Sequence, residues 1–114
     1  MRSRLTLLPM LFAALTFAAL TLPALAADPP EVTLVFLGDR FEPAVLTVPA
    51  NTKIAVKIEN RSAAAMEFES KTMHREKVVP AGGKATVFIG PLTPGSYEFF
   101  DDFHPNIKGT VVAR

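Results

Sequence analysis

The sequence contains no cysteine and only two histidines, His74 and His104. Without cysteine the chain can form no disulfide, although small exported domains often depend on disulfides. Neither histidine lies in a recognisable catalytic pattern, and the chain has no glycine-rich phosphate loop, no G-x-S-x-G turn and no C-x-x-C motif. The sequence therefore does not indicate a stand-alone enzyme.

Residues 1–26 have the order of a secretory signal peptide. Arg2 and Arg4 precede an uncharged run rich in Leu, Ala and Phe, which ends at the small-residue motif Ala24-Leu25-Ala26. A basic start, an apolar centre and an A-x-A ending predict export and cleavage after residue 26. The alternative is a membrane anchor over Leu5 to Ala26, since about 20 apolar residues can span a bilayer. A proline near each end of that stretch argues against the anchor.

Cleavage leaves residues 27–114 as one domain. Loss of Arg2 and Arg4 changes the formal charge from +1 to −1, so no basic patch remains to indicate nucleic acid. A domain of this size is close to the lower limit for a self-sufficient hydrophobic core. Its stability must come from packing and strand hydrogen bonds, with a bound metal ion as a further option.

This domain has the pattern of a series of short strands. Glycine and proline turns separate the apolar segments at spacings of about 8–12 residues, which is typical of a β-sandwich. Ser62 to Ala65 is helix-like in composition but too short to hold a helix alone. Pro43 lies inside the second strand, where proline requires an edge or a bulge. The predicted strands are residues 32–37, 41–48, 54–58, 66–69, 76–79, 85–89, 97–101 and 108–113.

A carboxylate and an imidazole lie close together near the end of one predicted strand. If Tyr97 and Phe99 face the core, strand alternation places Asp101 on the same face and Asp102 on the outer one. His104 follows three residues after Asp101, so a tight loop could bring the two side chains together as metal ligands. The alternative is a structural turn, in which Asp101 accepts backbone N–H bonds and His104 donates to it.

A second acidic group lies in the strand at Met66-Glu67-Phe68-Glu69. Alternation places both glutamates on one face and Met66 and Phe68 on the other. The glutamates are metal-ligand candidates. The alternative is an ordinary half-buried strand whose carboxylates face water or pair with Lys71, Arg75 and Lys77, at little net stabilisation. His74 lies in the polar segment that follows and is expected to be a solvated loop residue.

Several motifs resemble those of cupredoxin domains. The run from Phe41 to Thr52 resembles their opening F-x-P-x-x-I-x-V-x-A-G-T, Pro94 to Phe99 matches the P-G-x-Y-x-F that leads into the copper loop, and Lys108 to Val112 matches the closing K-G-x-hydrophobic strand. The resemblance covers nearly all of residues 27–114. It implies an antiparallel Greek-key β-sandwich, the cupredoxin-like fold.

The resemblance fails at the copper ligands. A blue-copper member would have histidine where Met66 stands, cysteine at Asp101 and methionine near Ile107, so only His104 matches. Type-1 copper requires a cysteine thiolate. A blue-copper site therefore cannot form in this chain.

The sequence is more similar to cupredoxin-like proteins of bacterial high-affinity ferrous-iron uptake. The similar stretches are Met66 to Ser70, Arg75 to Val79 and Phe99 to His104. The resemblance implies a periplasmic protein that binds iron or copper and acts with an inner-membrane iron permease, with help in Fe²⁺ oxidation as an accessory role. The residues carried over as metal ligands are Glu67, Glu69, Asp101 and His104, with Met66 and Asp102 as further candidates.

Two other functions stay open. One is a copper carrier or electron-transfer protein without a type-1 site, and the other is a metal-free interaction module. The geometry of the glutamates is also open, because an inward Met66 turns Glu67 and Glu69 away from Asp101 and His104. Either a bulge re-aims the strand, or the glutamates form a second, outward-facing site.

Overall fold

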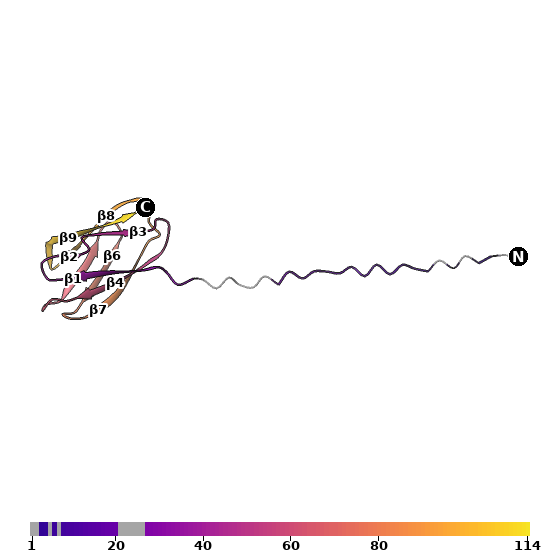
Figure 1. Cartoon of the computed structure of the whole chain (residues 1–114), viewed down its shortest axis with the longest axis horizontal. Coiled ribbons are helices and arrows are strands. Elements are labelled where there is room, and N and C mark those ends of the chain that lie inside the picture. Colours follow the sequence, from indigo (N-terminus) through magenta and orange to yellow (C-terminus); the bar gives the residue numbers. More distant parts are fainter. Residues whose placement is uncertain (1–2, 5, 7, 21–26) are drawn as a thin grey trace.

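A computed structural model describes residues 3–4, 6, 8–20 and 27–114. Residues 8–20 form an exposed, extended segment that leads away from the folded part (Figure 1). No helix in the described part of the chain is long and apolar enough to cross a membrane. The predicted cleavage motif at residues 24–26 lies outside the described residues.

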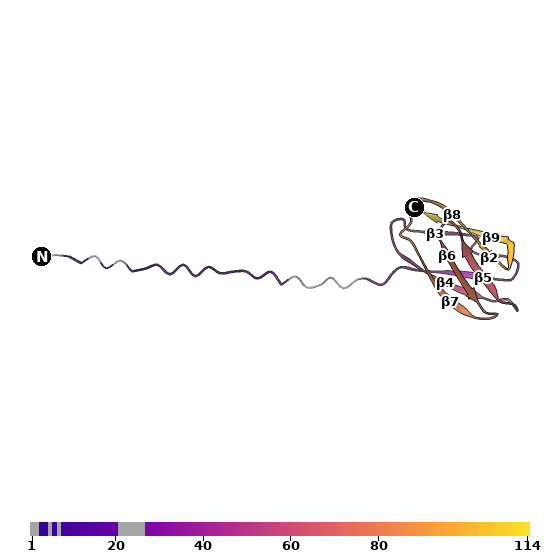
Figure 2. The ribbon, with the colours of Figure 1, turned by 180° about the vertical axis from the view of Figure 1, so that it is seen from behind.

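The folded part consists of strands arranged in two sheets, which Figures 1 and 2 show from opposite sides. One sheet has the strand order β2-β1-β4-β7, and the other has the order β3-β9-β8-β5-β6. The described residues contain no helix, so the predicted all-β, cupredoxin-like sandwich is confirmed. The strands are β1 (Glu31–Phe36), β2 (Phe41–Glu42), β3 (Val45–Val48), β4 (Ile54–Asn60), β5 (Met66–Ser70), β6 (Arg75–Val79), β7 (Lys84–Ile89), β8 (Gly95–Asp101) and β9 (His104–Ala113).

The resemblance implied antiparallel sheets, and in this detail it was wrong: each sheet is mixed, because it contains one parallel pair among its antiparallel ones. β1 is parallel to β4, and β3 is parallel to β9. The predicted strand at residues 41–48 is divided at Pro43 into β2 and β3, which belong to different sheets. Proline donates no ladder hydrogen bond, so this is where the chain leaves one sheet for the other.

The core lies between the sheets and follows the strand alternation. In β5, Met66, Phe68 and Ser70 are buried while Glu67 and Glu69 are only partly covered. Three rings pack together at the centre: Phe99 meets Phe41 edge to face at 4.9 Å between ring centroids and stacks on Phe68 at 5.3 Å. Such aromatic pairs add about 0.5–1.5 kcal/mol each beyond the area that they bury. Because the chain has no cysteine, this packing stabilises the domain in place of disulfide bonds.

The hairpin between β8 and β9 positions the candidate ligands. Asp102 and Phe103 form a two-residue turn, so Asp101 pairs directly with His104. The next pair is Phe100 with Lys108, which leaves residues 105–107 as a bulge on β9. β9 therefore starts at His104, four residues earlier than its predicted start at residue 108, because the turn is tight enough to pair His104 across the hairpin.

Candidate metal site

Asp101 is completely buried at the end of β8, where its carboxylate accepts hydrogen bonds from the backbone. Its Oδ1 accepts one from the Glu67 amide at 3.0 Å and one from the Phe103 amide at 3.1 Å. Burying a carboxylate is costly unless its oxygens find donors. The structural turn that the sequence left open is therefore present, and it joins β5 to the β8–β9 hairpin.

His104 lies against the other oxygen of the same carboxylate. Its Nδ1 is 3.0 Å from Oδ2 of Asp101. The histidine side chain is 58% exposed while that of Asp101 is 0% exposed. The predicted closeness of these two residues is thus observed, but only the imidazole is accessible to an ion from solvent.

Glu67 and Glu69 face outward from β5, as alternation predicts. β5 pairs with β6 without a bulge, from Met66 opposite Val79 to Ser70 opposite Arg75. No local feature re-aims the glutamates toward the core. Of the two geometries left open by the sequence, the structure has the outward-facing one.

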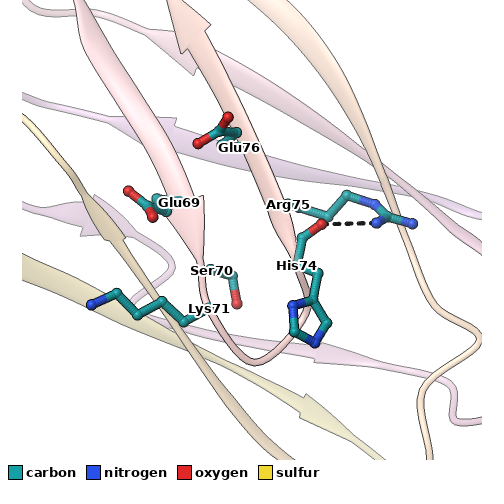
Figure 3. Close-up of a pocket in the computed structure, with 6 residues that line it drawn as sticks. All are labelled: Glu69, Ser70, Lys71, His74, Arg75 and Glu76. Carbon is teal, nitrogen blue, oxygen red and sulfur yellow. Dashed lines mark hydrogen bonds between the residues drawn. The ribbon is translucent and has the colours of Figure 1, made fainter.

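Glu76 joins these two glutamates from the neighbouring strand. It lies directly opposite Glu69 in the β5–β6 register. One carboxylate oxygen from each of Glu67, Glu69 and Glu76 lies within 4.8 Å of the others. We call these three residues the acidic cluster. In Figure 3 the carboxylates of Glu69 and Glu76 project to the same side of the hairpin.

Glu76 was missed as a ligand in the sequence analysis. The signal was present, because a hairpin that turns at residues 71–74 pairs Ser70 with Arg75 and therefore Glu69 with Glu76. Glu76 would then share the outward face with Glu69. Alternation alone gives the face of Glu76, and only the hairpin register shows that it lies opposite Glu69.

Asp102 adds a fourth carboxylate beside the acidic cluster. Its amide donates to the Glu67 carbonyl at 2.9 Å. Burial raises the pKa of Glu67, and the charges of Asp102, Glu76 and Asp101 raise it further. Burial also raises the pKa of Glu69, followed by the charge of Asp102 and hydrogen bonding to it. The carboxylates therefore oppose one another's ionisation, which is the condition that a bound cation relieves.

No basic side chain among the described residues neutralises the acidic cluster. Within the described part of the chain, its three carboxylates take part in no salt bridge. The ammonium of Lys71 lies over the Phe100 ring at 5.9 Å. Arg75 donates instead to the carbonyls of Phe88, at 2.8 Å, and His74, at 2.9 Å. The pairing with Lys71, Arg75 and Lys77 that the sequence left open is therefore not observed among the described residues.

The remaining candidates lie elsewhere. Met66 is fully buried in the core, so its sulfur is shielded from an ion that binds at the surface. His74 is exposed, as predicted, in the turn between β5 and β6. It lines a shallow depression together with Glu69 and Glu76, although its ring points away from their carboxylates in Figure 3.

The candidates thus form two separate groups. Asp101 and His104 lie at the end of the β8–β9 hairpin, and the acidic cluster lies on the outer face of β5 and β6. Asp102, in the turn of the β8–β9 hairpin, lies beside the acidic cluster. The residues do not fit a blue-copper site. The chain has no thiolate, and the oxygens of Asp101 already accept hydrogen bonds from two amides and contact His104.

Comparison with known proteins agrees with this architecture. The two mixed sheets, packed around a phenylalanine core, define a cupredoxin-like β-sandwich. A family model for the cupredoxin-like domain matches residues 8–113. The chain therefore belongs to the cupredoxin-like domain family, and the resemblance seen in its motifs is confirmed at that level. Membership in an iron-uptake group stays a prediction.

Individual relatives were also found. An uncharacterized protein of Rickettsia prowazekii is 40% identical over 85 residues, which are 74% of this chain and 68% of that protein. The metal-binding domain of the Cu(I)-exporting P-type ATPase CopA of Streptococcus pneumoniae has a TM-score of 0.65 at 12% identity, covering 74% of this chain and 84% of that one. Auracyanin A, a blue copper protein of Chloroflexus aurantiacus, has a TM-score of 0.64 at 14% identity, covering 76% and 100%. At these identities the solved structures establish a shared fold.

Proposed function

We propose that this protein binds a metal ion through carboxylates on the outer face of its sandwich. The observation that carries the proposal is the acidic cluster, three glutamates whose oxygens lie within 4.8 Å of one another without a neutralising salt bridge among the described residues. Asp102 stands beside them as a fourth oxygen donor. A bound cation would offset the repulsion between carboxylates that, after burial, raises the pKa of Glu67 and Glu69.

The donor set favours iron over Cu⁺. Carboxylate oxygens are hard ligands that suit Fe²⁺, Fe³⁺ and other hard cations, whereas Cu⁺ prefers sulfur. We therefore extend the proposal to a periplasmic iron-binding protein that acts with an inner-membrane iron permease in ferrous-iron uptake. The similarity of Met66 to Ser70, Arg75 to Val79 and Phe99 to His104 to proteins of such systems supports this extension. Because carboxylates stabilise the higher charge of Fe³⁺, a bound Fe²⁺ ion would give up its electron more readily to an external one-electron acceptor, and Fe³⁺ would stay bound.

Isothermal titration calorimetry with Fe²⁺, Fe³⁺ and Cu²⁺ tests the metal site. We expect Glu69→Gln to weaken iron binding by about tenfold or more, because it removes the central one of three charged ligands. Glu98→Gln is the matched control, since Glu98 is an exposed carboxylate of β8 that pairs with Lys108 at 3.5 Å. An equal loss of iron affinity in both variants would contradict the proposal. So would the absence of binding of all three ions at micromolar concentration.

A second candidate function is copper binding at His104. The exposed imidazole is the type of donor that Cu²⁺ prefers, and copper is named in the descriptions of the CopA domain and auracyanin A. Without a thiolate, copper at His104 would be a colourless or weakly coloured carrier or electron-transfer site.

Electron paramagnetic resonance of the Cu²⁺-loaded protein tests this second function. We expect type-2 parameters and no intense blue absorption. The signal should be lost in His104→Gln and kept in His74→Gln, which removes the other histidine. A signal that survives in His104→Gln would show adventitious copper binding.

A further inference from the structure

The two ring nitrogens of His104 have different surroundings. Nδ1 lies 3.0 Å from Oδ2 of the fully buried Asp101. None of the described residues supplies a hydrogen-bond partner for Nε2, and the side chain is 58% exposed. From this geometry we infer that Asp101 is a positioning residue: it holds the proton of His104 on Nδ1 and leaves a bare Nε2 toward solvent as the donor atom for a metal ion.

The hydrogen bonds of Asp101 decide which nitrogen carries the proton. Its Oδ1 accepts from the amides of Glu67 and Phe103. A carboxylate offers only acceptors, so the contact between Oδ2 and Nδ1 needs a proton from the imidazole. In a neutral imidazole with its proton on Nδ1, Nε2 has a free lone pair.

The backbone holds this pair in place. Asp101 and His104 are directly opposed across a two-residue turn. The Asp102 amide donates to the Glu67 carbonyl at 2.9 Å, which fastens the turn to β5. Because the carboxylate is buried and bonded on both oxygens, the ring that leans on it is oriented before any ligand arrives. A histidine that donates its other N–H to a carboxylate is a common arrangement at metal sites and makes the metal-binding nitrogen more basic.

This inference rests on the second proposed function, metal binding at His104. It changes the role of one residue, Asp101. The sequence predicts Asp101 and His104 as two metal ligands of the same kind. In this inference Asp101 does not bind the metal itself; it acts by orienting His104. It also makes Nε2 the ligand atom, since Nδ1 is occupied by Asp101.

Asp101→Asn gives a sharp test. The two amides require an acceptor at the Oδ1 position, so the Asn oxygen must stay there and its NH₂ group must face Nδ1. Nδ1 then has to accept, and the imidazole proton moves to Nε2. Nuclear magnetic resonance of the ¹⁵N-labelled histidines reads the tautomer directly. We expect a bare Nε2 in the unchanged protein and a protonated Nε2 in Asp101→Asn.

Two control variants complete the experiment. Asp39→Asn makes the same chemical change at an exposed aspartate that pairs with Arg40, and it should leave the tautomer unchanged. His74→Gln assigns the signals, because it removes the other histidine. If Asp101→Asn fails to fold, the unchanged protein still decides, since a protonated Nε2 there overturns the inference. An unchanged tautomer in folded Asp101→Asn would also overturn it.

A metal arm separates this inference from the proposed function. Substoichiometric Cu²⁺ should broaden the His104 ring signals of the unchanged protein at least about tenfold more strongly than those of Asp101→Asn. Equal broadening in both proteins would overturn the assignment of Nε2 as the donor that Asp101 prepares. If neither protein is broadened while calorimetry also shows no metal binding, the proposed function fails and the donor assignment fails with it. If the tautomers are as expected in that case, the hydrogen-bond account of Asp101 stands by itself.

Discussion

Gly109 lies on β9 opposite Phe99 of β8, and the buried phenyl ring occupies the space above it. A Cβ added at Gly109 would lie 2.6 Å from Cε2 of Phe99, closer still to Cζ, and 3.1 Å from the Ala44 carbonyl oxygen. Phe99 cannot give way easily, since it is packed between the rings of Phe41 and Phe68. The glycine is therefore a requirement of the core at this position.

We expect Gly109→Ala to lower the free energy of unfolding by about 1–3 kcal/mol, the usual cost of overpacking a core. Gly95→Ala is the control in β8, because a Cβ there would meet only ordinary contacts, the nearest being Cε2 of Tyr97 at 3.7 Å. It should change stability by no more than about 0.5 kcal/mol. Chemical denaturation measures both. Equal effects of the two substitutions would contradict this account of Gly109.

At the scale of elements, the β5–β6 hairpin concentrates negative charge on one face. Glu69 and Glu76 are directly opposed across the two strands, and like charges in that position destabilise a sheet. The folded domain therefore ionises Glu67 and Glu69 less readily than the unfolded chain does. Their pKa values are raised by burial and by neighbouring carboxylates.

This charge concentration predicts a pH dependence of stability in the absence of metal. Because the folded pKa of Glu69 is raised above its ordinary 4.5, its contribution to stability is complete below that value and is lost as pH rises through the folded pKa. Glu69→Gln should therefore raise the unfolding midpoint at about pH 7 and have little effect at about pH 4, where the carboxyl group is protonated. Thermal unfolding at the two pH values checks this. Equal effects at both would show that the charge of Glu69 is not responsible.

At the scale of the whole molecule, the sandwich is separate from the segment that precedes it. All nine strands of the described residues lie between Glu31 and Ala113. The buried core begins at Leu34. Residues 8–20 are exposed, and their hydrogen bonding is local, from the Ala13 amide to the Leu11 carbonyl. None of the described residues before Leu34 belongs to the buried core.

We therefore expect a chain that starts at Ala27 to unfold at the same temperature as the full chain. For a domain of this size, a change of about 1 kcal/mol in the free energy of unfolding shifts the midpoint by roughly 4–8 °C. A difference within about 2 °C would mean that residues 1–26 contribute almost nothing to stability. Differential scanning calorimetry of the two chains measures the difference. If the chain that starts at Ala27 has a midpoint lowered by more than about 4 °C, residues 1–26 pack on the domain.

The fold was predictable from sequence to a large extent, and the site only in part. Alternation correctly placed Met66 and Phe68 inside and Glu67 and Glu69 outside. The parallel pairing of β3 with β9 was not predictable, because it joins residues more than 60 positions apart and depends on where the chain changes sheets. The turn contacts of Asp101 with a backbone amide and with His104 were among the predicted alternatives, but its bond from the Glu67 amide was not predictable, because it joins residues 34 positions apart.

The sequence by itself determined the strands, their inner faces and the impossibility of a blue-copper site, because these depend on local periodicity and on the absence of cysteine. Only the tertiary structure decided which candidate ligands meet. Strand register set Glu76 opposite Glu69, and a two-residue turn set His104 against Asp101. Both outcomes depend on pairing between strands. Pairing fixes distances between side chains, whereas periodicity fixes only the face on which each side chain lies.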